Sequence, residues 1–296
     1  MKKKSKRIDS KTSRTAEMTC VTRAASFFEK NPCYKSDDFI APKLLPVFML
    51  PLIKMSIIRY FYRNVISPKG IYEYVIARTK YIDSIYIESL ENGFQQVVIF
   101  GAGFDSRGLR FVAEYPKTTV FELDVPITQN AKIAQLQKRR ISISDNINFI
   151  PIDFNKESVI EKLDQFGFNK NRRTLFLLEG LLMYLDSSSV NTTLNIIRDN
   201  TINGSEIVFD FVYASVLNKE HRYYGEKDIS KYVSTAGEGW TFGIQEEEIE
   251  LFLEEYSLKV KEMKNSIDLE NLYFRNDVGE LQGRINGTHC IVRAAF

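Results

Sequence analysis

The chain has 296 residues, of which 44% are hydrophobic and 26% are charged, values that are ordinary for a folded globular protein. Its formal net charge is only +2, from 40 basic and 38 acidic residues. The chain as a whole therefore lacks the strongly basic balance of a nucleic-acid-binding protein, and we do not expect nucleic acid as its partner.

Cysteine and histidine are scarce. The three cysteines, Cys20, Cys33 and Cys290, contain no Cys-x-x-Cys pair, and only two histidines are present. We therefore expect neither a disulfide framework nor a metal site, and a reducing, cytoplasmic compartment fits this composition.

Residues 1–11 form a basic block in which Asp9 is the one acid. Such a block is typical of a disordered, solvated arm, and an arm that touches RNA or a membrane is the alternative. No apolar stretch follows it, so a signal peptide is not expected.

Residues 12–92 are predicted to be helical and to form a lid, because apolar residues recur at helical spacing over 71–85. Residues 44–53 are almost wholly apolar, but the run contains Pro46 and Pro51 and is shorter than the roughly 20 residues of a membrane-spanning helix. We expect a buried helix or hairpin there; a mobile cap over a binding cleft is the alternative.

After Gly93 the pattern changes to short apolar runs separated by helical segments. Such runs are typical of parallel strands that are buried on both faces. Strands that alternate with helices predict a doubly wound α/β sheet over residues 93–296. The predicted strands are 96–100, 118–123, 147–152, 174–178 and 206–211, followed by 257–264 and 288–295, which we expect to form a hairpin at the sheet edge.

Gly101 and Gly103 follow the first predicted strand in the sequence Gly-Ala-Gly-Phe-Asp-Ser-Arg. Glycine permits a tight turn and lets a ligand lie against the backbone, and sheets of this kind bind ligands at the carboxyl ends of their strands. A dinucleotide fingerprint would have a third glycine where Ser106 stands. A turn that binds no ligand is the alternative.

Asp124 ends the second predicted strand. A carboxylate at this place can accept hydrogen bonds from both hydroxyls of a ribose, or it can cap the end of the strand. Glu122 points to the same side, because side chains repeat every two residues along a strand. Nicotinamide enzymes and S-adenosylmethionine enzymes both use such an acid, so it does not separate the two.

Asp153 and Phe154 follow the third predicted strand. Asp153 could meet the exocyclic amine of an adenine and Phe154 its ring face. The alternative is an acid at the start of a helix beside a core phenylalanine. Asn155 is expected to cap that helix.

Glu179 interrupts a long apolar run after the fourth predicted strand. Burial of a carboxylate without a partner is costly, so we expect a cation beside it. The sulfonium or ammonium group of S-adenosylmethionine would suffice, and so would a nearby arginine.

Five pieces of sequence together resemble the leucine carboxyl methyltransferase family, including bacterial S-adenosylmethionine-dependent O-methyltransferases of the type linked to polyketide biosynthesis. Their order and spacing are specific, although no single piece is, and the resemblance covers roughly residues 12–265. The pieces are Ser13-Arg-Thr-Ala16 with Arg23-Ala24, Ala77-Arg-Thr79 with Asp83, Gly101 to Arg107, Phe121 to Pro126, and Leu178 to Leu185.

The resemblance implies a class I methyltransferase fold, Rossmann-like, with seven strands of which the last is antiparallel, and S-adenosylmethionine as the cofactor. The residues that it assigns to cofactor binding are Arg78 for the methionine carboxylate, Gly101 and Gly103 for the methionine portion along the backbone, Asp124 for the ribose, Asp153 and Phe154 for the adenine, Glu179 for the amino group and, in the N-terminal stretch, Arg23.

The implied reaction is methyl transfer to a carboxylate or hydroxyl oxygen of a small-molecule acceptor, polyketide-like in the bacterial relatives. A carboxylate needs no general base, whereas a hydroxyl benefits from one. No catalytic residue is assigned: His221, in the segment 212–240 where acceptor specificity would be set, and Tyr184 are the candidates. Carboxyl methylation of a protein C-terminus, a non-catalytic cofactor-binding protein and a nicotinamide oxidoreductase are the alternatives.

Overall fold

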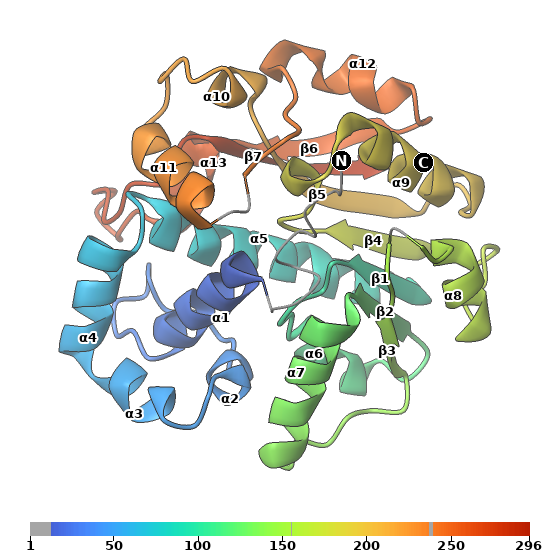
Figure 1. The fold of residues 1–296 in the computed structure, drawn as a ribbon, viewed down its shortest axis with the longest axis horizontal. Coiled ribbons are helices and arrows are strands. Elements are labelled where there is room, and N and C mark those ends of the chain that lie inside the picture. Colours follow the sequence, from blue (N-terminus) through green and yellow to red (C-terminus); the bar gives the residue numbers. More distant parts are fainter. Residues whose placement is uncertain (1–12, 155, 237–238) are drawn as a thin grey trace, which may run out of the picture.

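A seven-stranded sheet with helices on both faces forms the centre of the computed structural model, which describes residues 13–154, 156–236 and 239–296 (Figure 1). The expected basic arm, 1–11, and Asn155 lie outside the described residues. The strands are β1 (Gln96–Phe100), β2 (Thr119–Asp124), β3 (Ile147–Pro151), β4 (Thr174–Leu178), β5 (Glu206–Val212), β6 (Lys259–Lys264) and β7 (His289–Ala295).

The strand order is β3-β2-β1-β4-β5-β7-β6. Strands β1 to β5 are parallel, and β7 is antiparallel to both of its neighbours, β5 and β6. All seven predicted strands are present, with bounds that differ by at most two residues, which confirms the doubly wound α/β fold. The expected hairpin is wrong in its connection, because β6 and β7 pair but a helix, α13, lies between them in the chain.

Burial explains why β7 and not β6 lies next to β5. The sequence of β7, His-Cys-Ile-Val-Arg-Ala-Ala, is buried at all but its last position. The sequence of β6, Lys-Val-Lys-Glu-Met-Lys, is charged at four of its six positions and has no fully buried residue. Charged side chains suit the edge of a sheet, where the outer row of backbone groups faces solvent.

Two helical layers cover the sheet. In β4, Leu175 and Leu177 pack with α5 and α13, whereas Phe176 and Leu178 pack on the opposite face with α8, α9 and α12. The helices are α1 (Arg14–Phe27), α2 (Ala41–Leu44), α3 (Met49–Lys54), α4 (Ser56–Phe61), the π-helix η2 (Tyr62–Ile66), α5 (Ile71–Glu91), α6 (Arg107–Phe111), η3 (Val112–Glu114), α7 (Pro126–Lys138), α8 (Val159–Gln165), η4 (Leu182–Tyr184), α9 (Ser187–Asp199), α10 (Ala214–Leu217), α11 (Glu226–Ala236), η5 (Glu246–Glu248), α12 (Ile249–Glu254) and α13 (Ser266–Tyr273).

Polar side chains set where several of these helices begin. Asp186 accepts a hydrogen bond from the Ser189 backbone N–H and is the N-cap of α9. Helix α8 begins at Val159 with Ser158 as its N-cap. None of the helices in the described part of the chain is long and apolar enough to cross a lipid bilayer.

Residues 44–53 differ from expectation. Leu44, Leu45 and Ile53 are buried, but Phe48 and Leu52 are exposed, Phe48 at 72%. The prediction of a buried helix or hairpin is therefore wrong for most of the run. The chain turns outward after α2 and forms α3, α4 and η2 at the edge of the molecule (Figure 1).

A pair of leucines tests this account of the core. Leu177→Ala removes a fully buried side chain from a central strand, and we expect a loss of about 2–5 kcal/mol in the free energy of unfolding. Leu251→Ala on α12, where the side chain is 65% exposed, should change it by no more than about 0.5 kcal/mol. Urea unfolding followed by circular dichroism measures both, and equal losses would contradict the assigned layers.

Candidate functional site

The strand order reverses between β1 and β4, and parallel sheets bind ligands at such a switch point, outside the carboxyl ends of the strands. Four predicted or newly found polar features meet at this edge. The turn at Gly101–Gly103 follows β1, Asp124 ends β2, Glu179 follows β4, and Asp210 lies near the end of β5. The fold therefore brings together residues that are more than 100 positions apart.

The glycine turn depends on its two glycines. Gly101 and Gly103 have φ of +60° and +54°, a left-handed conformation that residues with a side chain rarely adopt. A Cβ on Gly101 would lie 3.1 Å from Leu181, and one on Gly103 would lie 3.3 Å from Ala16 of α1. Helix α1 therefore packs directly against the turn.

Asp124 accepts hydrogen bonds from the backbone N–H groups of Gly103 and Val125, the latter at 2.6 Å. These are the contacts of a residue that caps a strand and holds the turn. Burial outweighs the two N–H donors and raises the pKa of Asp124 to about 6. Its ribose-binding role stays a prediction.

Glu122 has the same strand face as Asp124 but a different environment. It is fully buried and forms an ion pair with Lys132 of α7. Burial raises the pKa of Glu122 to about 7, against the opposing effect of Lys132. The Glu122 carboxylate is therefore paired within the protein, with Lys132.

A connected set of buried and partly buried charges surrounds the switch point, and we refer to it as the carboxylate–guanidinium network. Each member lies within ion-pair distance of at least one other. The members are the carboxylates of Asp38, Asp83, Asp105, Glu179 and Asp210 and the guanidinium groups of Arg23, Arg78, Arg107 and Arg110.

Glu179 lies at the centre of the network. Its Oε1 is 2.9 Å from Arg78 Nε, and its Oε2 is 2.7 Å from Arg107 Nη1. Arg78 Nη1 in turn donates to Asp210 at 2.6 Å. The cation that the sequence predicted beside Glu179 is therefore arginine, and a cofactor is not needed to explain the burial of this carboxylate.

Arg107 joins the glycine turn to helix α5. It contacts Glu179 and Asp105 through Nη1, and its Nε donates to Asp83 of α5 at 2.8 Å. Burial alone would raise the pKa of Asp105, but neighbouring cations, Arg107 first among them, outweigh it and lower that pKa to about 2. Asp105 also accepts a hydrogen bond from the Arg107 backbone N–H at 2.7 Å, so a carboxylate occupies the start of α6.

Arg23 holds the glycine-rich loop from the side of α1. It donates to Asp38 at 2.7 Å, to Ser106 Oγ at 3.2 Å and to the Phe104 carbonyl oxygen at 2.5 Å. These contacts fix the loop, and a direct contact with a cofactor stays a prediction.

Asp153 and Phe154 lie just beyond β3. Asp153 pairs with Lys156 at 2.8 Å, and Phe154 is 38% exposed, so its ring is accessible beside the carboxyl end of the sheet. The expectation of an adenine contact is compatible with this position and stays a prediction.

The two candidate bases have different surroundings. His221 is on the loop before α11, where its Nδ1 lies 3.5 Å from Glu226 and its side chain is 43% exposed. The Tyr184 hydroxyl lies 3.4 Å from Thr15 Oγ1, so Tyr184 meets the first turn of α1. Neither is assigned a catalytic role by these contacts.

The sequence interpretation missed a buried cluster beside Arg78. Tyr74 donates to Asp210 at 2.8 Å, and the ring of His289 stacks on Tyr74 with centroids 4.4 Å apart. Burial lowers the pKa of His289 to about 4, so its imidazole is neutral near pH 7. One signal could have revealed Asp210, because it is a lone acid in an apolar strand, as Glu179 is after β4.

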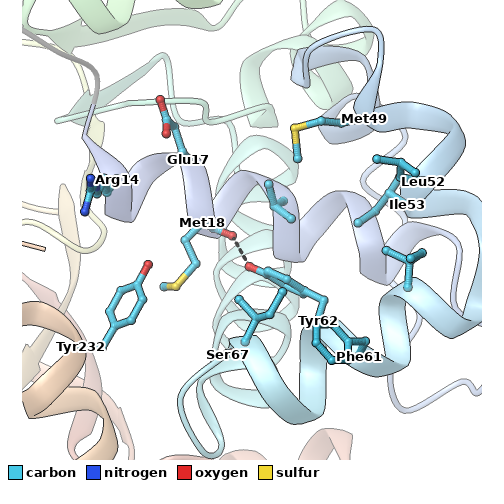
Figure 2. A pocket seen from close by; sticks show the side chains of 13 residues that line it. Arg14, Glu17, Met18, Met49, Leu52, Ile53, Phe61, Tyr62, Ser67 and Tyr232 are labelled. Atoms are coloured by element: carbon cyan, nitrogen blue, oxygen red, sulfur yellow. Dashed lines mark hydrogen bonds between the residues drawn. The ribbon is translucent and has the colours of Figure 1, made fainter. Parts of the chain in front are cut away.

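An apolar pocket of about 480 Å³ lies on the other side of α1 from the glycine turn (Figure 2). Arg14 and Glu17 lie at one end of α1, and apolar side chains of α1, α3, α4 and η2 form most of the wall. The lining residues are Arg14, Glu17, Met18, Val21, Met49, Leu52, Ile53, Ile58, Phe61, Tyr62, Ile66, Ser67 and Tyr232. Tyr232 is the one residue of the pocket from the segment 212–240.

Over residues 13–154, 156–236 and 239–296, no three His, Cys, Asp or Glu side chains form a metal-binding group.

The sheet order, the antiparallel β7 and the glycine turn after β1 define a class I methyltransferase fold. The model of the leucine carboxyl methyltransferase family matches residues 16–198, and the chain belongs to that family. This confirms the resemblance that the sequence motifs indicated.

Two relatives of this chain are named as S-adenosylmethionine-dependent methyltransferases. A Bacillus subtilis (strain 168) protein named "Putative S-adenosyl-L-methionine-dependent methyltransferase YktD" is 29% identical over 68% of this chain and 66% of its own length. A protein of the same kind from Mycobacterium marinum is 26% identical over 66% of this chain and 64% of its own length. The chain thus spans just under two thirds of these relatives.

Two solved structures share the fold. A crystal structure of a "putative methyltransferase" from Thermobifida fusca YX has a TM-score of 0.61 at 16% identity, with 96% of this chain and 95% of that chain covered. A DUF574 family protein from Streptomyces avermitilis has a TM-score of 0.61 at 11% identity, with 97% and 99% covered.

Removal of one guanidinium tests the network. Arg107→Met leaves Asp105 buried beside a neutral side chain, and we expect a loss of about 3–5 kcal/mol in the free energy of unfolding at pH 7. The stability that comes from the lowered pKa of Asp105 is present above its ordinary pKa of 3.8 and is lost as the pH falls toward about 2. The deficit of the variant should therefore be smaller at pH 2.5, inside this window, than at pH 7 in urea titrations.

Arg222→Met is the matched control, because Arg222 and Glu220 form an exposed ion pair worth less than about 1 kcal/mol. If the free energy of unfolding falls by the same small amount in both arginine variants, the network does not stabilise the site.

Proposed function

We propose that the protein is an S-adenosylmethionine-dependent methyltransferase that methylates a carboxylate or hydroxyl oxygen of a small-molecule acceptor. Membership of the leucine carboxyl methyltransferase family and the names of the relatives support the reaction class. The observation that carries the proposal for this chain is the sign of the charge around the switch point.

The carboxylate–guanidinium network holds five carboxylates and four guanidinium groups, a formal charge of −1 at neutral pH. Asp124, beside the glycine turn, adds a further negative charge above its pKa of about 6. A partly buried site with excess negative charge favours a ligand with net positive charge. S-adenosylmethionine fits, because its sulfonium and ammonium groups outnumber its one carboxylate.

The residues at the site also match the parts of this cofactor. Arg78 Nε lies 2.9 Å from Glu179 and Nη1 donates to Asp210, and the place of this guanidinium beside the end of β4 supports a contact with the methionine carboxylate. Gly101 is partly exposed, and Gly103 is buried against α1 beside Asp124, which would accept the ribose hydroxyls. Asp153 and Phe154 would receive the adenine, and Glu179 the amino group.

A nicotinamide dinucleotide fits less well. Its pyrophosphate would need the N-terminus of the helix after β1. In this chain the Asp105 carboxylate already accepts the Arg107 N–H at the start of α6, and a phosphate there would meet like charge. Ser106 in place of a third glycine agrees with this argument.

When bound, S-adenosylmethionine supplies an electrophilic methyl group. The chain's own task is then to align the acceptor oxygen and to exclude water. We propose that residues 12–92 act as the lid for this purpose, since α1 packs against the glycine turn and Arg107 connects the turn to α5. The apolar pocket beyond α1 suits the apolar body of an acceptor. A carboxylate acceptor needs no base; His221 and Tyr184 stay candidates for a hydroxyl acceptor.

Calorimetric titration with S-adenosylmethionine tests the cofactor. We expect binding to the wild type and at least about tenfold weaker binding to Asp124→Ala, since hydrogen bonds to a charged group are lost. Asp164→Ala, which removes an exposed aspartate on α8, is the control and should bind like the wild type.

Tighter binding of NADH than of S-adenosylmethionine would overturn the proposal. Binding without formation of S-adenosylhomocysteine over a panel of carboxylic acid and phenol acceptors would favour the non-catalytic alternative.

The pH dependence of binding provides a second test. Because the pKa of Asp124 is raised to about 6, this side chain is a carboxylate above that pH and a weaker acceptor below it. The affinity for S-adenosylmethionine should fall below pH 6, by at most about tenfold per pH unit. Asp124→Asn should bind more weakly with a flat profile between pH 5 and pH 8, and an unchanged profile in this variant would assign the titration to another group.

A further inference from the structure

The segment 47–66, which we refer to as the apolar edge, exposes nine large apolar side chains within 20 residues. They are nine of the nineteen such side chains that are exposed in the described part of the chain. Clusters of this kind mark surfaces that bind a membrane or another molecule, whereas single exposed apolar residues are ordinary. The nine are Val47, Phe48, Leu52, Met55, Ile57, Tyr60, Phe61, Val65 and Ile66.

The outward orientation of these side chains is fixed by specific contacts on the inner side of the segment. Buried Arg59 donates to the carbonyl oxygens of Ile53 and Lys54 and lies 3.3 Å from Glu29. Tyr62 makes hydrogen-bond contacts with Thr22 and with the Met18 carbonyl oxygen of α1 (Figure 2). The segment is thus anchored by its polar inner side, and its apolar side chains face away from the core.

The charged residues within the stretch that contains the apolar edge are all basic, although Glu29, outside this stretch, pairs with Arg59 and Glu17 lines the pocket. Residues 39–72 contain Lys43, Lys54, Arg59, Arg63 and Lys69 and no aspartate or glutamate. Arg59 pairs with Glu29, Lys69 lies 3.7 Å from Asp228, and Arg63 packs on the Tyr34 ring near Glu73, which leaves Lys43 and Lys54 as the basic residues of this stretch with no ion pair among the described residues. Exposed Phe, Leu and Ile side chains with Lys and Arg beside them are typical of segments that lie in the interface of an anionic bilayer.

We propose that the apolar edge docks onto the surface of an anionic lipid bilayer. The apolar side chains would enter the boundary between headgroups and acyl chains, while Lys43 and Lys54 remain at the level of the anionic headgroups. A second copy of the chain is a poorer partner, because a two-fold contact between identical edges would bring lysine and arginine against lysine and arginine.

Docking in this way has a consequence for the pocket. Leu52, Phe61 and Ile66 belong both to the apolar edge and to the pocket lining, so the pocket would face the bilayer. A lipophilic acceptor would then reach the pocket without crossing water. This consequence rests on the proposed function, whereas the docking itself does not.

Co-sedimentation with vesicles tests the docking. We expect the full chain to bind vesicles of phosphatidylcholine with phosphatidylglycerol more strongly than vesicles of phosphatidylcholine alone. Phe48→Ser with Ile57→Ser changes two exposed side chains that do not line the pocket and should weaken binding by at least about tenfold. Leu251→Ser with Val278→Ser changes two equally exposed apolar residues elsewhere and should leave binding unchanged.

Lys43→Gln with Lys54→Gln should remove the preference for phosphatidylglycerol. Absence of vesicle binding by the wild type, or equal binding by the Phe48/Ile57 variant, would overturn the proposal. So would a dimer in solution that this variant dissociates, because a second copy would then cover the edge. Calorimetry without vesicles separates the two proposals: the edge variants should bind S-adenosylmethionine normally, and Asp124→Ala should bind vesicles normally.

Discussion

The position of Glu179 between Arg78 and Arg107 is the contact on which the rest of the site depends. Through it, the end of β4 is joined to helix α5, to the glycine turn after β1 and, by way of Asp210, to β5. Charges this well buried are tolerated only when each has a partner. The end of β4, helix α5 and the glycine turn are therefore held in place by the same group of charges.

The strands and the polar residues at their ends could be predicted, because a continuous apolar run and a lone acid within it are local signals. The partners of those acids could not. Arg78 and Glu179 are about a hundred residues apart, and nothing local in either segment says that they meet. Glu122 and Asp124 show the same limit. Alternation places both on one face of the strand, but Glu122 forms an ion pair with Lys132 of the following helix, whereas Asp124 accepts a hydrogen bond from the glycine turn.

The apolar edge shows where composition alone misleads. A run of leucine, isoleucine and phenylalanine predicts burial, but Pro46 follows the end of α2, and Arg59 anchors the next segment through backbone carbonyls. Few of its apolar side chains can then reach the core. A cluster of exposed apolar side chains indicates a binding surface, and the charges beside the cluster indicate the kind of partner that binds there.

The place of β7 in the sheet also affects how the chain folds during synthesis. Strand β6 leaves the ribosome before β7, yet β7 is its one neighbour in the sheet. Until β7 emerges, β6 is an unpaired strand at risk of joining another nascent chain. The lysines and the glutamate of β6 make such pairing unfavourable, so its charged sequence serves as protection during translation as well as an edge in the finished protein.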